Sequence, residues 1–305
     1  REINKFHSTF IDSIQRYVHK GRIHSEINQL RSDQGGTVSG RLSYSNPNLQ
    51  QIPARNKEYG DKIRSLFLPE EGRQWGSFDY SQQEPRLVAH YAAAVDNNFT
   101  GADEFIEAYK NEAADFHQIV ADMAGISRTN AKTINLGLFY GMGKAKLAKE
   151  LGISKDAADN LLSKYHSRVP FVKKLAEAVT GSASKYGFIR TIRGRKCRFD
   201  MWEPATFGMN KAMQYEEAKA IYGNNIRRAF TYKALNRLIQ GSAADQTKQA
   251  MINCYKAGYM PLLQIHDELC FSINEENDIK GVKEVMENAI ENLKVPFKVD
   301  VAIGK

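Results

Sequence analysis

The stretch LLQIHDELCFSI, residues 262–273, predicts a β-hairpin with acidic residues at its tip. Two apolar arms, LLQI and LCFSI, flank His266, Asp267 and Glu268, so the hydrophobic pattern breaks at one central point. One interpretation of these polar residues is a solvated turn, and the other is a metal site. The choice between them depends on whether a second carboxylate lies close by.

A second carboxylate stands in GSFDYSQQEPR, residues 76–86. Asp79 ends a short apolar strand, and Pro85 suits the first turn of a helix, where its missing N–H costs nothing. Asp79 is therefore either a turn cap or a functional acid. If Asp79 and Asp267 converge, they repel each other unless a cation lies between them, and magnesium is the hard cation suited to carboxylates and phosphates.

The stretch RTNAKTINLGLFYGMGK, residues 128–144, predicts a helix with one functional face. Arg128, Lys132, Leu136 and Tyr140 recur at every fourth position, which places them on the same side of a helix. The two cations are suited to phosphates, and the apolar and aromatic side chains are suited to a base. The alternative is an amphipathic helix with a solvated basic edge.

Composition and element order indicate a globular α+β chain with an anionic partner. The 305 residues are 42% hydrophobic and carry a formal net charge of +8, which favours nucleic acid or leaves only a basic surface. The three cysteines are far apart in the sequence, which predicts neither a zinc site nor a disulfide framework and fits a reducing compartment. Strands cluster at the two ends of the chain and helices fill the middle, as expected for one α+β domain with a helical insertion.

Five segments in order resemble motifs of the family A DNA polymerases, the group typified by bacterial DNA polymerase I. They are GRLSYSNPNLQQIP, DYSQQE, the R-x3-K-x3-L-x3-YG pattern, QGSAAD and HDE. The resemblance extends over about residues 5–303 and implies an α+β right-hand polymerase, with an antiparallel palm sheet and mostly helical fingers. It places the palm at residues 1–90 and 226–305 and the fingers at 91–225, with the thumb largely absent and no 3′–5′ exonuclease in the chain.

The resemblance implies a template-directed DNA polymerase that adds dNTPs to a primer 3′ hydroxyl with two Mg²⁺ ions. It assigns the metals to Asp79, Asp267 and the carbonyl of Tyr80, with Glu268 as a secondary carboxylate near them. It makes Lys132 a proton donor to the pyrophosphate leaving group. Positioning and charge neutralisation supply most of the rate in such phosphoryl transfers.

The resemblance also assigns the substrate contacts. The residues expected to bind the dNTP are Gln82, Glu84, His117, Arg128, Lys132, Leu136 and Tyr140. Those expected to contact the primer–template are Arg41, Asn48, Gln50, Asn236, Gln240 and His266. Leu136 stands where many members carry Phe or Tyr and some phage-borne members carry Leu, and Tyr232 stands where Arg is frequent.

The expected partners are primer–template DNA and dNTPs, bound by a monomer in the cytoplasm of a bacterium or of an infected host. No membrane is expected, because no apolar run is long enough to span one; a processivity factor cannot be read from the chain. Two alternatives stay open. One is an enzyme resembling a single-subunit RNA polymerase, against which Glu84 and Tyr140 argue, and the other is a truncated fragment that binds primer–template without appreciable turnover.

Overall fold

A computed structural model of the chain describes residues 7–33, 35–52, 59–95, 102–110, 115–139, 142–206, 208 and 211–304. These residues form two compact units. Unit 1 comprises Arg1–Ser81, Ala244–Glu291 and Phe297–Lys305, and unit 2 comprises Gln82–Ala243 and Asn292–Pro296. The mixed helix and sheet content confirms the predicted α+β class. The predicted limits of the palm and fingers stay predictions.

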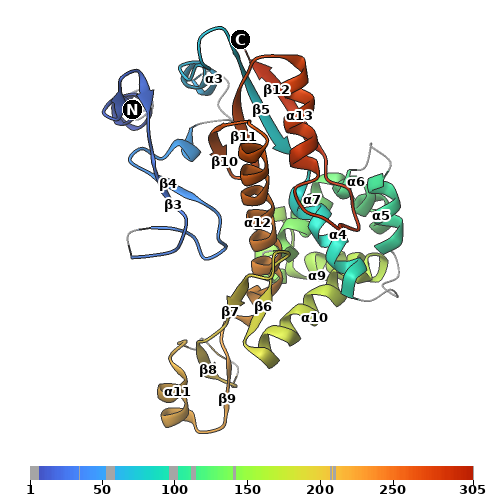
Figure 1. The fold of residues 1–305 in the computed structure, drawn as a ribbon. Coiled ribbons are helices and arrows are strands. Elements are labelled where there is room, and N and C mark those ends of the chain that lie inside the picture. Colours follow the sequence, from blue (N-terminus) through green and yellow to red (C-terminus); the bar gives the residue numbers. More distant parts are fainter. Residues whose placement is uncertain are drawn as a thin grey trace. The chain divides into compact units, whose positions relative to one another are not determined.

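The core of unit 1 is a four-stranded antiparallel sheet in the order β10-β11-β5-β12 (Figure 1). Its strands are β5 (Gln74–Tyr80), β10 (Pro261–Ile265), β11 (Glu268–Ile273) and β12 (Val299–Gly304). The predicted hairpin is thus present, as β10 and β11. Side chains alternate between the faces of a strand, so Phe78 and Tyr80 of β5 are buried on one face while Asp79 lies on the other.

Both faces of this sheet are packed. The Phe78 and Phe271 rings meet edge to face at 5.4 Å, and the Tyr80 hydroxyl donates to the carbonyl of Met286 in α13 (Glu276–Glu287). The opposite face carries a second apolar cluster that joins the sheet to the N-terminal segments: Leu42, Tyr44, Leu49, Ile52, Ile63, Leu263 and Cys270. Packing on both faces fixes the sheet, and therefore its polar end, as a rigid element.

The N-terminal segments of unit 1 are short. They are η1 (His7–Asp12), α2 (Ser13–Gln15), β1 (Val18–His19), β2 (Arg22–Ile23), β3 (Glu26–Asn28), β4 (Ser43–Ser45), η2 (Leu49–Gln51) and α3 (Gly60–Arg64). Helix α12 (Ala234–Lys256) contributes its C-terminal part to unit 1 and its first turns to unit 2. Helix α12 begins at Ala234, ahead of the start near residue 241 that the sequence indicated.

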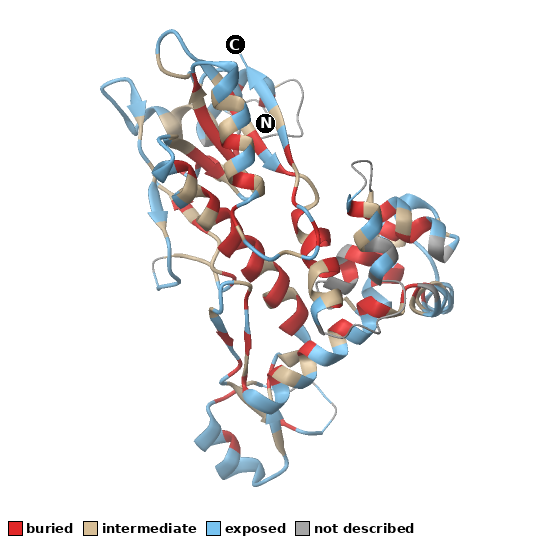
Figure 2. Ribbon diagram, turned by 45° about the vertical axis from the view of Figure 1, so that its right-hand side comes forward, coloured by how far each residue is buried: buried red, intermediate tan, exposed pale blue. Residues whose placement is uncertain are grey.

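Unit 2 is mostly helical. Its helices are α4 (Gln83–Val95), α5 (Ala102–Lys110), α6 (Phe116–Ala124), α7 (Arg128–Phe139), α8 (Lys144–Leu151), α9 (Lys155–Arg168) and α10 (Pro170–Tyr186). The Ser154 side chain accepts from the N–H of Ala157 and so caps the start of α9. Buried residues recur at helical spacing along α10, from Phe171 to Ala183, and form its inner stripe (Figure 2).

The rest of unit 2 is a series of short strands and one helix. A basic hairpin comes first, formed by β6 (Phe188–Arg190) and β7 (Lys196–Arg198). It is followed by β8 (Trp202–Pro204), α11 (Tyr215–Tyr222), β9 (Ile226–Arg228) and η3 (Thr231–Lys233). The pairing of β8 with β9 was not predicted, because three-residue strands are too short to show a period of two.

None of the helices in the described ranges combines the length and the apolar character needed to cross a membrane.

Candidate functional site

Carboxylates from four separate positions meet at one end of the unit 1 sheet. The register sets Asp79 of β5 opposite Glu268 of β11 on one side and opposite Asp300 of β12 on the other. Asp267 precedes Glu268 in the turn, and its carbonyl accepts from the N–H of Tyr80 at 3.3 Å. The structure thus brings together the two acids that we expected to converge. Asp300 was missed, since nothing in the sequence shows which residues face β5 from β12.

A tight turn holds Asp267 in place. His266 and Asp267 alone connect β10 to β11, and His266 has a φ of 58°, in the left-handed region that two-residue hairpin turns use. Gln264 Nε2 donates to the carbonyl of His266 at 2.5 Å, and Gln50 Nε2 donates to Gln264 Oε1 at 3.0 Å. Gln50, a predicted DNA contact, therefore supports the turn through Gln264.

Mutual repulsion shapes the electrostatics of this site. Partial burial, followed by the negative charges of Asp267, Glu268 and Asp300, raises the pKa of Asp79 to about 7. Burial also raises the pKa of Asp267, although the positive charges of Arg41 and His266 act in the opposite direction. A bound cation would relieve the repulsion between these carboxylates. Because carboxylates offer only oxygen ligands, a hard cation such as magnesium suits the site.

The residues fit a metal that is shared with a substrate. Among the described residues, no group of three or more His, Cys, Asp and Glu side chains has the arrangement of a metal site by itself. Magnesium is usually held by one or two carboxylates together with waters and substrate phosphates. A pair of acids at an accessible end of the sheet, without a complete set of protein ligands among the described residues, matches that pattern.

Two predicted primer–template residues lie beside the same turn. Arg41 and His266 line one small crevice of unit 1, together with Gln264 and part of α12. Asn48, another predicted contact, is exposed and accepts from the N–H of Gln50, which caps η2. Arg41 and His266 therefore offer positive and hydrogen-bonding groups next to Asp267, whereas Asn48 has a local structural contact.

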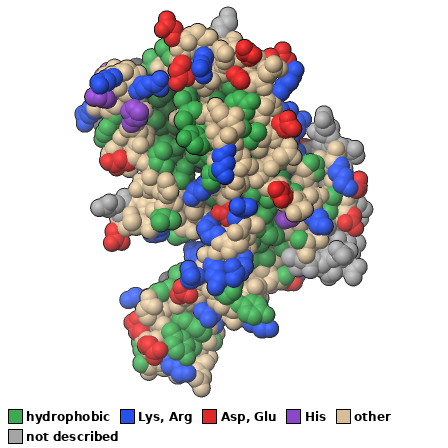
Figure 3. Space-filling view, in the orientation of Figure 1, with side chains coloured by type: hydrophobic (Ala, Val, Ile, Leu, Met, Phe, Trp, Pro, Cys, Tyr) green, Lys and Arg blue, Asp and Glu red, His purple; other side chains and the backbone are tan. Residues whose placement is uncertain are grey.

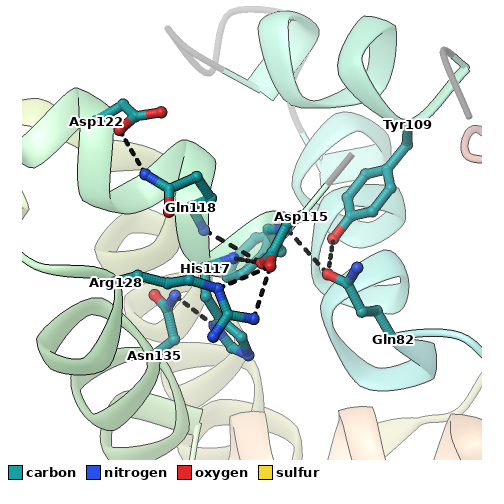
Figure 4. Close-up of polar contacts among 9 residues, drawn as sticks. Gln82, Tyr109, Asp115, His117, Gln118, Asp122, Arg128 and Asn135 are labelled. Carbon is teal, nitrogen blue, oxygen red and sulfur yellow. Dashed lines mark hydrogen bonds and ion pairs between the residues drawn. The ribbon is translucent and has the colours of Figure 1, made fainter. Parts of the chain in front are cut away.

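Two of the residues predicted to bind the dNTP, His117 of α6 and Arg128 of α7, lie on either side of Asp115 (Figure 4). Asp115 caps α6 by accepting from the backbone N–H groups of His117 and Gln118, at 2.9 and 3.2 Å. The same side chain receives two donors from Arg128, Nε at 2.8 Å and Nη2 at 2.6 Å. Burial acts to raise the pKa of Asp115, but these hydrogen bonds outweigh it and hold the pKa below its ordinary value. Asp115 thereby orients Arg128, while Lys132 lies exposed one turn further along α7.

His117 is fixed by a buried polar chain that the sequence did not reveal. Asn135 is fully buried, and its amide Nδ2 lies 3.1 Å from His117 Nδ1. The Tyr165 hydroxyl donates to Asn135 Oδ1 at 2.6 Å. Because the Asn135 amide nitrogen can only donate, His117 Nδ1 accepts and Nε2 carries the proton. Burial, aided by Lys132 and Arg128, lowers the pKa of His117 despite the opposing charge of Asp115.

The sequence position of Asn135 is the feature that could have identified it as part of the site. It follows Lys132 by three residues in α7 and is an amide between the buried Ile134 and the functional face. A fully buried amide on an otherwise apolar side of a helix needs a polar partner, so the sequence pattern indicates a network but not its members.

The other predicted dNTP contacts have varied surroundings. Gln82 Oε1 accepts from the N–H of Phe116 at 2.9 Å and from the Tyr109 hydroxyl at 3.3 Å, so it links the start of α4 to α5 and α6 (Figure 4). Glu84 is half-buried in the first turn of α4. Leu136 lies on α7, but the structure does not describe its side chain, and Tyr140 lies outside the described residues.

Two predicted DNA contacts, Asn236 and Gln240, lie on consecutive turns of α12 and are both half-buried. The Asn236 amide nitrogen is buried and has no hydrogen-bond partner within the described part of the chain. An amide donor left without a partner costs stability, so it is often completed by a ligand.

Comparisons with known proteins agree on one family. Residues 1–305 match the model of DNA polymerase family A. A DNA-directed DNA polymerase of Pseudomonas phage M6 is 37% identical, over 100% of this chain and 50% of the relative. The thermostable DNA polymerase I of Thermus filiformis is 34% identical, over 100% of this chain and 35% of the relative.

A solved structure is similar in fold as well. The POL domain of Pol1 from M. smegmatis, in a complex with DNA primer-template and dNTP, has a TM-score of 0.78 and 33% sequence identity. The match covers 100% of this chain and 51% of that one. The chain therefore spans about half the length, or less, of the relatives it matches.

Proposed function

The chain belongs to DNA polymerase family A, and we propose on this basis that it catalyses template-directed addition of dNTPs to a primer 3′ hydroxyl. The observation that carries the proposal is the pairing of β5 with β11, which sets Asp79 opposite Glu268 and brings it next to Asp267. Primer–template DNA and dNTPs are the proposed partners, supported by the ligands of the M. smegmatis relative.

Members of this family use divalent metal ions, and we propose two Mg²⁺ ions for this chain. Asp79 and Asp267, with the carbonyl of Tyr80, are the proposed ligands, and Glu268 is a nearby secondary carboxylate. Bound magnesium would make the primer hydroxyl a better nucleophile and neutralise charge on the phosphates. The rigid strand register holds the carboxylates in a fixed geometry before the substrate binds, which removes the cost of ordering them later.

Three residues of α6 and α7, His117, Arg128 and Lys132, form the proposed triphosphate site. Arg128 and Lys132 neutralise phosphate charge, and the Nε2–H of His117 donates to a phosphate oxygen. The primer hydroxyl gives its proton to solvent as its oxygen forms a bond to the α-phosphorus, and the bond from that phosphorus to the bridging oxygen of the β-phosphate breaks. Lys132 then gives its proton to the departing pyrophosphate, a step for which general acids contribute about a hundredfold or more.

The remaining substrate contacts are proposed from the family resemblance. Glu84, Leu136 and Tyr140 are assigned to the sugar and base of the dNTP, with Gln82 close to them. Arg41, Asn48, Gln50, Asn236, Gln240 and His266 are assigned to the primer–template. The buried, unpaired amide of Asn236 and the position of Arg41 next to Asp267 support two of these assignments.

We also propose that the chain acts as a monomer in the cytoplasm of a bacterium or an infected host. The three cysteines are buried free thiols, which supports a reducing compartment. Light scattering of the purified chain with and without DNA tests the monomer assignment.

Primer extension in magnesium tests the proposed function. We expect extension with dNTPs on a templated primer, and none without a template or with rNTPs alone. Asp79→Ala and Asp267→Ala should abolish it, whereas Asp61→Ala, which removes an exposed acid of α3, should not. Equal use of rNTPs would instead support the RNA polymerase alternative. Tight binding of primer–template without extension would indicate a fragment that binds but does not turn over.

A further inference from the structure

A pocket of about 400 Å³ opens on the acid-bearing face of the unit 1 sheet, and we call it the sheet pocket. Its lining comes from α3, from the segment after α3 and from all four strands, and it lies entirely within unit 1. Sites for small organic molecules are typically roughly 300–1,000 Å³ in volume. The lining side chains that matter most are Arg64, Phe67, Trp75, Ser77, Cys270 and Ala302.

The strand register explains why side chains do not fill this pocket. Ser77 of β5 lies opposite Cys270 of β11 on one side and opposite Ala302 of β12 on the other. Three small side chains therefore form one row across the sheet and leave space above them. Two residues further along each strand, on the same face, lies the row of carboxylates that includes Asp79. The sheet pocket is thus the direct neighbour of the carboxylate site.

Apolar and aromatic side chains form the walls of the sheet pocket. Trp75 of β5 and Phe67 are half-buried, so part of each ring stays accessible. Leu263 and Ile265 of β10 line the pocket from the other side of the small row. Hydrophobic side chains gather over the part of unit 1 that carries α3, β10 and β11 (Figure 3). A flat apolar molecule that covers these rings would remove apolar surface from water.

Two side chains of opposite charge give the sheet pocket a polarity. The Cys270 thiol donates to Glu268 Oε1 at 3.6 Å, so the carboxylate lies next to the floor. Arg64 ends α3, is exposed and also lines the pocket. Burial, followed by the charge of Glu268, raises the pKa of the Cys270 thiol to about 12, and the charge of Arg64 opposes them. A bound anion would therefore be attracted by Arg64 and repelled by Glu268.

We propose that the sheet pocket binds a small aromatic molecule that carries one anionic group. The rings lie on the row of small side chains and pack against Trp75 and Phe67, and the anionic group meets Arg64. A cationic ligand would be repelled by Arg64, and an uncharged one would leave it without a role. That an occupied pocket slows primer extension, through its contact with Glu268, rests on the proposed function.

Two probes that differ by one charge test the proposed ligand class. Anilinonaphthalene sulfonate (ANS) is an aromatic anion, and N-phenylnaphthylamine has the same rings without the sulfonate. Binding is measured in EDTA and without DNA, as energy transfer from Trp75 to the probe. The chain has two tryptophans, so a Trp202→Phe background leaves Trp75 as the donor.

Each variant of the sheet pocket has a matched control. Ala302→Phe, at an exposed position of the edge strand β12, places a ring in the pocket, and Ala257→Phe makes the same change at an exposed position outside it. Arg64→Gln removes the cation, and Lys62→Gln removes an exposed cation of α3 that does not line the pocket. Circular dichroism checks that all four variants fold as the wild type does.

Filling the pocket should affect both probes, and removing the cation should affect only one. Ala302→Phe should weaken both by on the order of tenfold, because the ring occupies their volume, whereas Ala257→Phe should stay within about twofold. Arg64→Gln should weaken ANS about threefold, as expected for an accessible ion pair, and should leave N-phenylnaphthylamine unchanged. Equal binding by Ala302→Phe and Ala257→Phe, or no energy transfer in the parent chain, would overturn the site. ANS binding that Arg64→Gln and Lys62→Gln alter equally would overturn the anionic class.

Primer extension separates the effect of the ligand from the proposed function. ANS should slow extension by the wild type and by Ala257→Phe, and Ala302→Phe should resist it while extending like the wild type without the probe. Equal inhibition of all three would contradict the link to Glu268. If the wild type extends no primer, the proposed function fails, while the probe titrations still decide whether the sheet pocket binds an aromatic anion.

Discussion

The two units place their charged groups by different means. In unit 1, Asp79, Glu268 and Asp300 are far apart in the sequence and meet because three strands pair in one register. In unit 2, Arg128 and Lys132 are neighbours on one helix, and the Arg128 partner caps the adjacent helix. The acidic site is therefore a property of the whole sheet, whereas the cationic site can be altered one side chain at a time.

The largest effect is expected at the acidic site. Asp267→Asn keeps the shape of the turn but removes a charge, and we expect kcat for primer extension to fall on the order of a thousandfold. Higher dNTP concentration should not restore it, because the lost carboxylate charge stabilises the transition state more than it stabilises the bound nucleotide. Steady-state kinetics on a fixed primer–template measure this change, and a fall confined to KM would contradict the assignment.

A smaller effect is expected for the proposed proton donor. Lys132→Ala should lower kcat by about a hundredfold, which is the contribution of a typical general acid. Lys149→Ala, which alters an exposed cation of α8, provides the control. An unchanged kcat together with a raised KM would indicate that Lys132 only binds phosphate.

The buried chain behind His117 should give a modest effect on both stability and binding. Tyr165→Phe leaves Asn135 Oδ1 without its donor, which costs about 1–3 kcal/mol of the free energy of unfolding. Because His117 is then held less firmly, KM for dNTP should rise a few-fold with little change in kcat. Urea unfolding and steady-state kinetics measure the two quantities. The exposed Tyr186→Phe is the control, and equal effects of both variants would exclude a positioning role.

The smallest expected effect is on how the free energy of unfolding depends on pH. The pKa of Asp79 is raised from 3.8 to about 7, so the folded protein holds this proton more tightly than the unfolded chain. That contribution to stability is fully present below the unfolded pKa and is lost as the pH rises through about 7. Without divalent ions, Asp79→Asn should therefore gain stability relative to the wild type between pH 4 and pH 7.

Thermal unfolding in EDTA at several pH values measures this difference, and the gain should be greatest near pH 8. Added magnesium should reduce it by stabilising the wild-type carboxylates. A difference that does not change with pH would mean that burial and the neighbouring acids do not raise the pKa of Asp79.

The two units also differ in how far the sequence predicted them. The hairpin β10–β11 was predicted because HDE interrupts an apolar pattern, and the end of β5 was predicted for the same reason. Arg128 and Lys132 lie together on α7, as their four-residue spacing predicted, whereas the Leu136 side chain and Tyr140 lie outside the description. By contrast, the chain from Tyr165 to Asn135 to His117 joins three helices, and no local pattern shows which side chains meet across such contacts.

Residues 185–237 show a third case. Their twelve Lys and Arg against four Asp and Glu are visible in the sequence, but cations on a surface usually face water, so the cluster alone carries little information. The structure adds the pairing of Arg228 of β9 with the Trp202 ring of β8, and of Lys219 with the Tyr215 ring of α11; the two strands are too short to be predicted. Tertiary contacts, rather than composition, therefore distinguish this surface from an ordinary basic one.

A double-mutant cycle tests the central claim, that Asp79 and Asp267 act together on shared divalent ions. The rate of primer extension is measured for Asp79→Asn, Asp267→Asn and the double variant, at saturating magnesium and dNTP. Residues that act as a unit have non-additive effects, so the double variant should be no more than a few-fold slower than the more impaired single variant. Losses that multiply would show that the two acids act independently and would contradict the account.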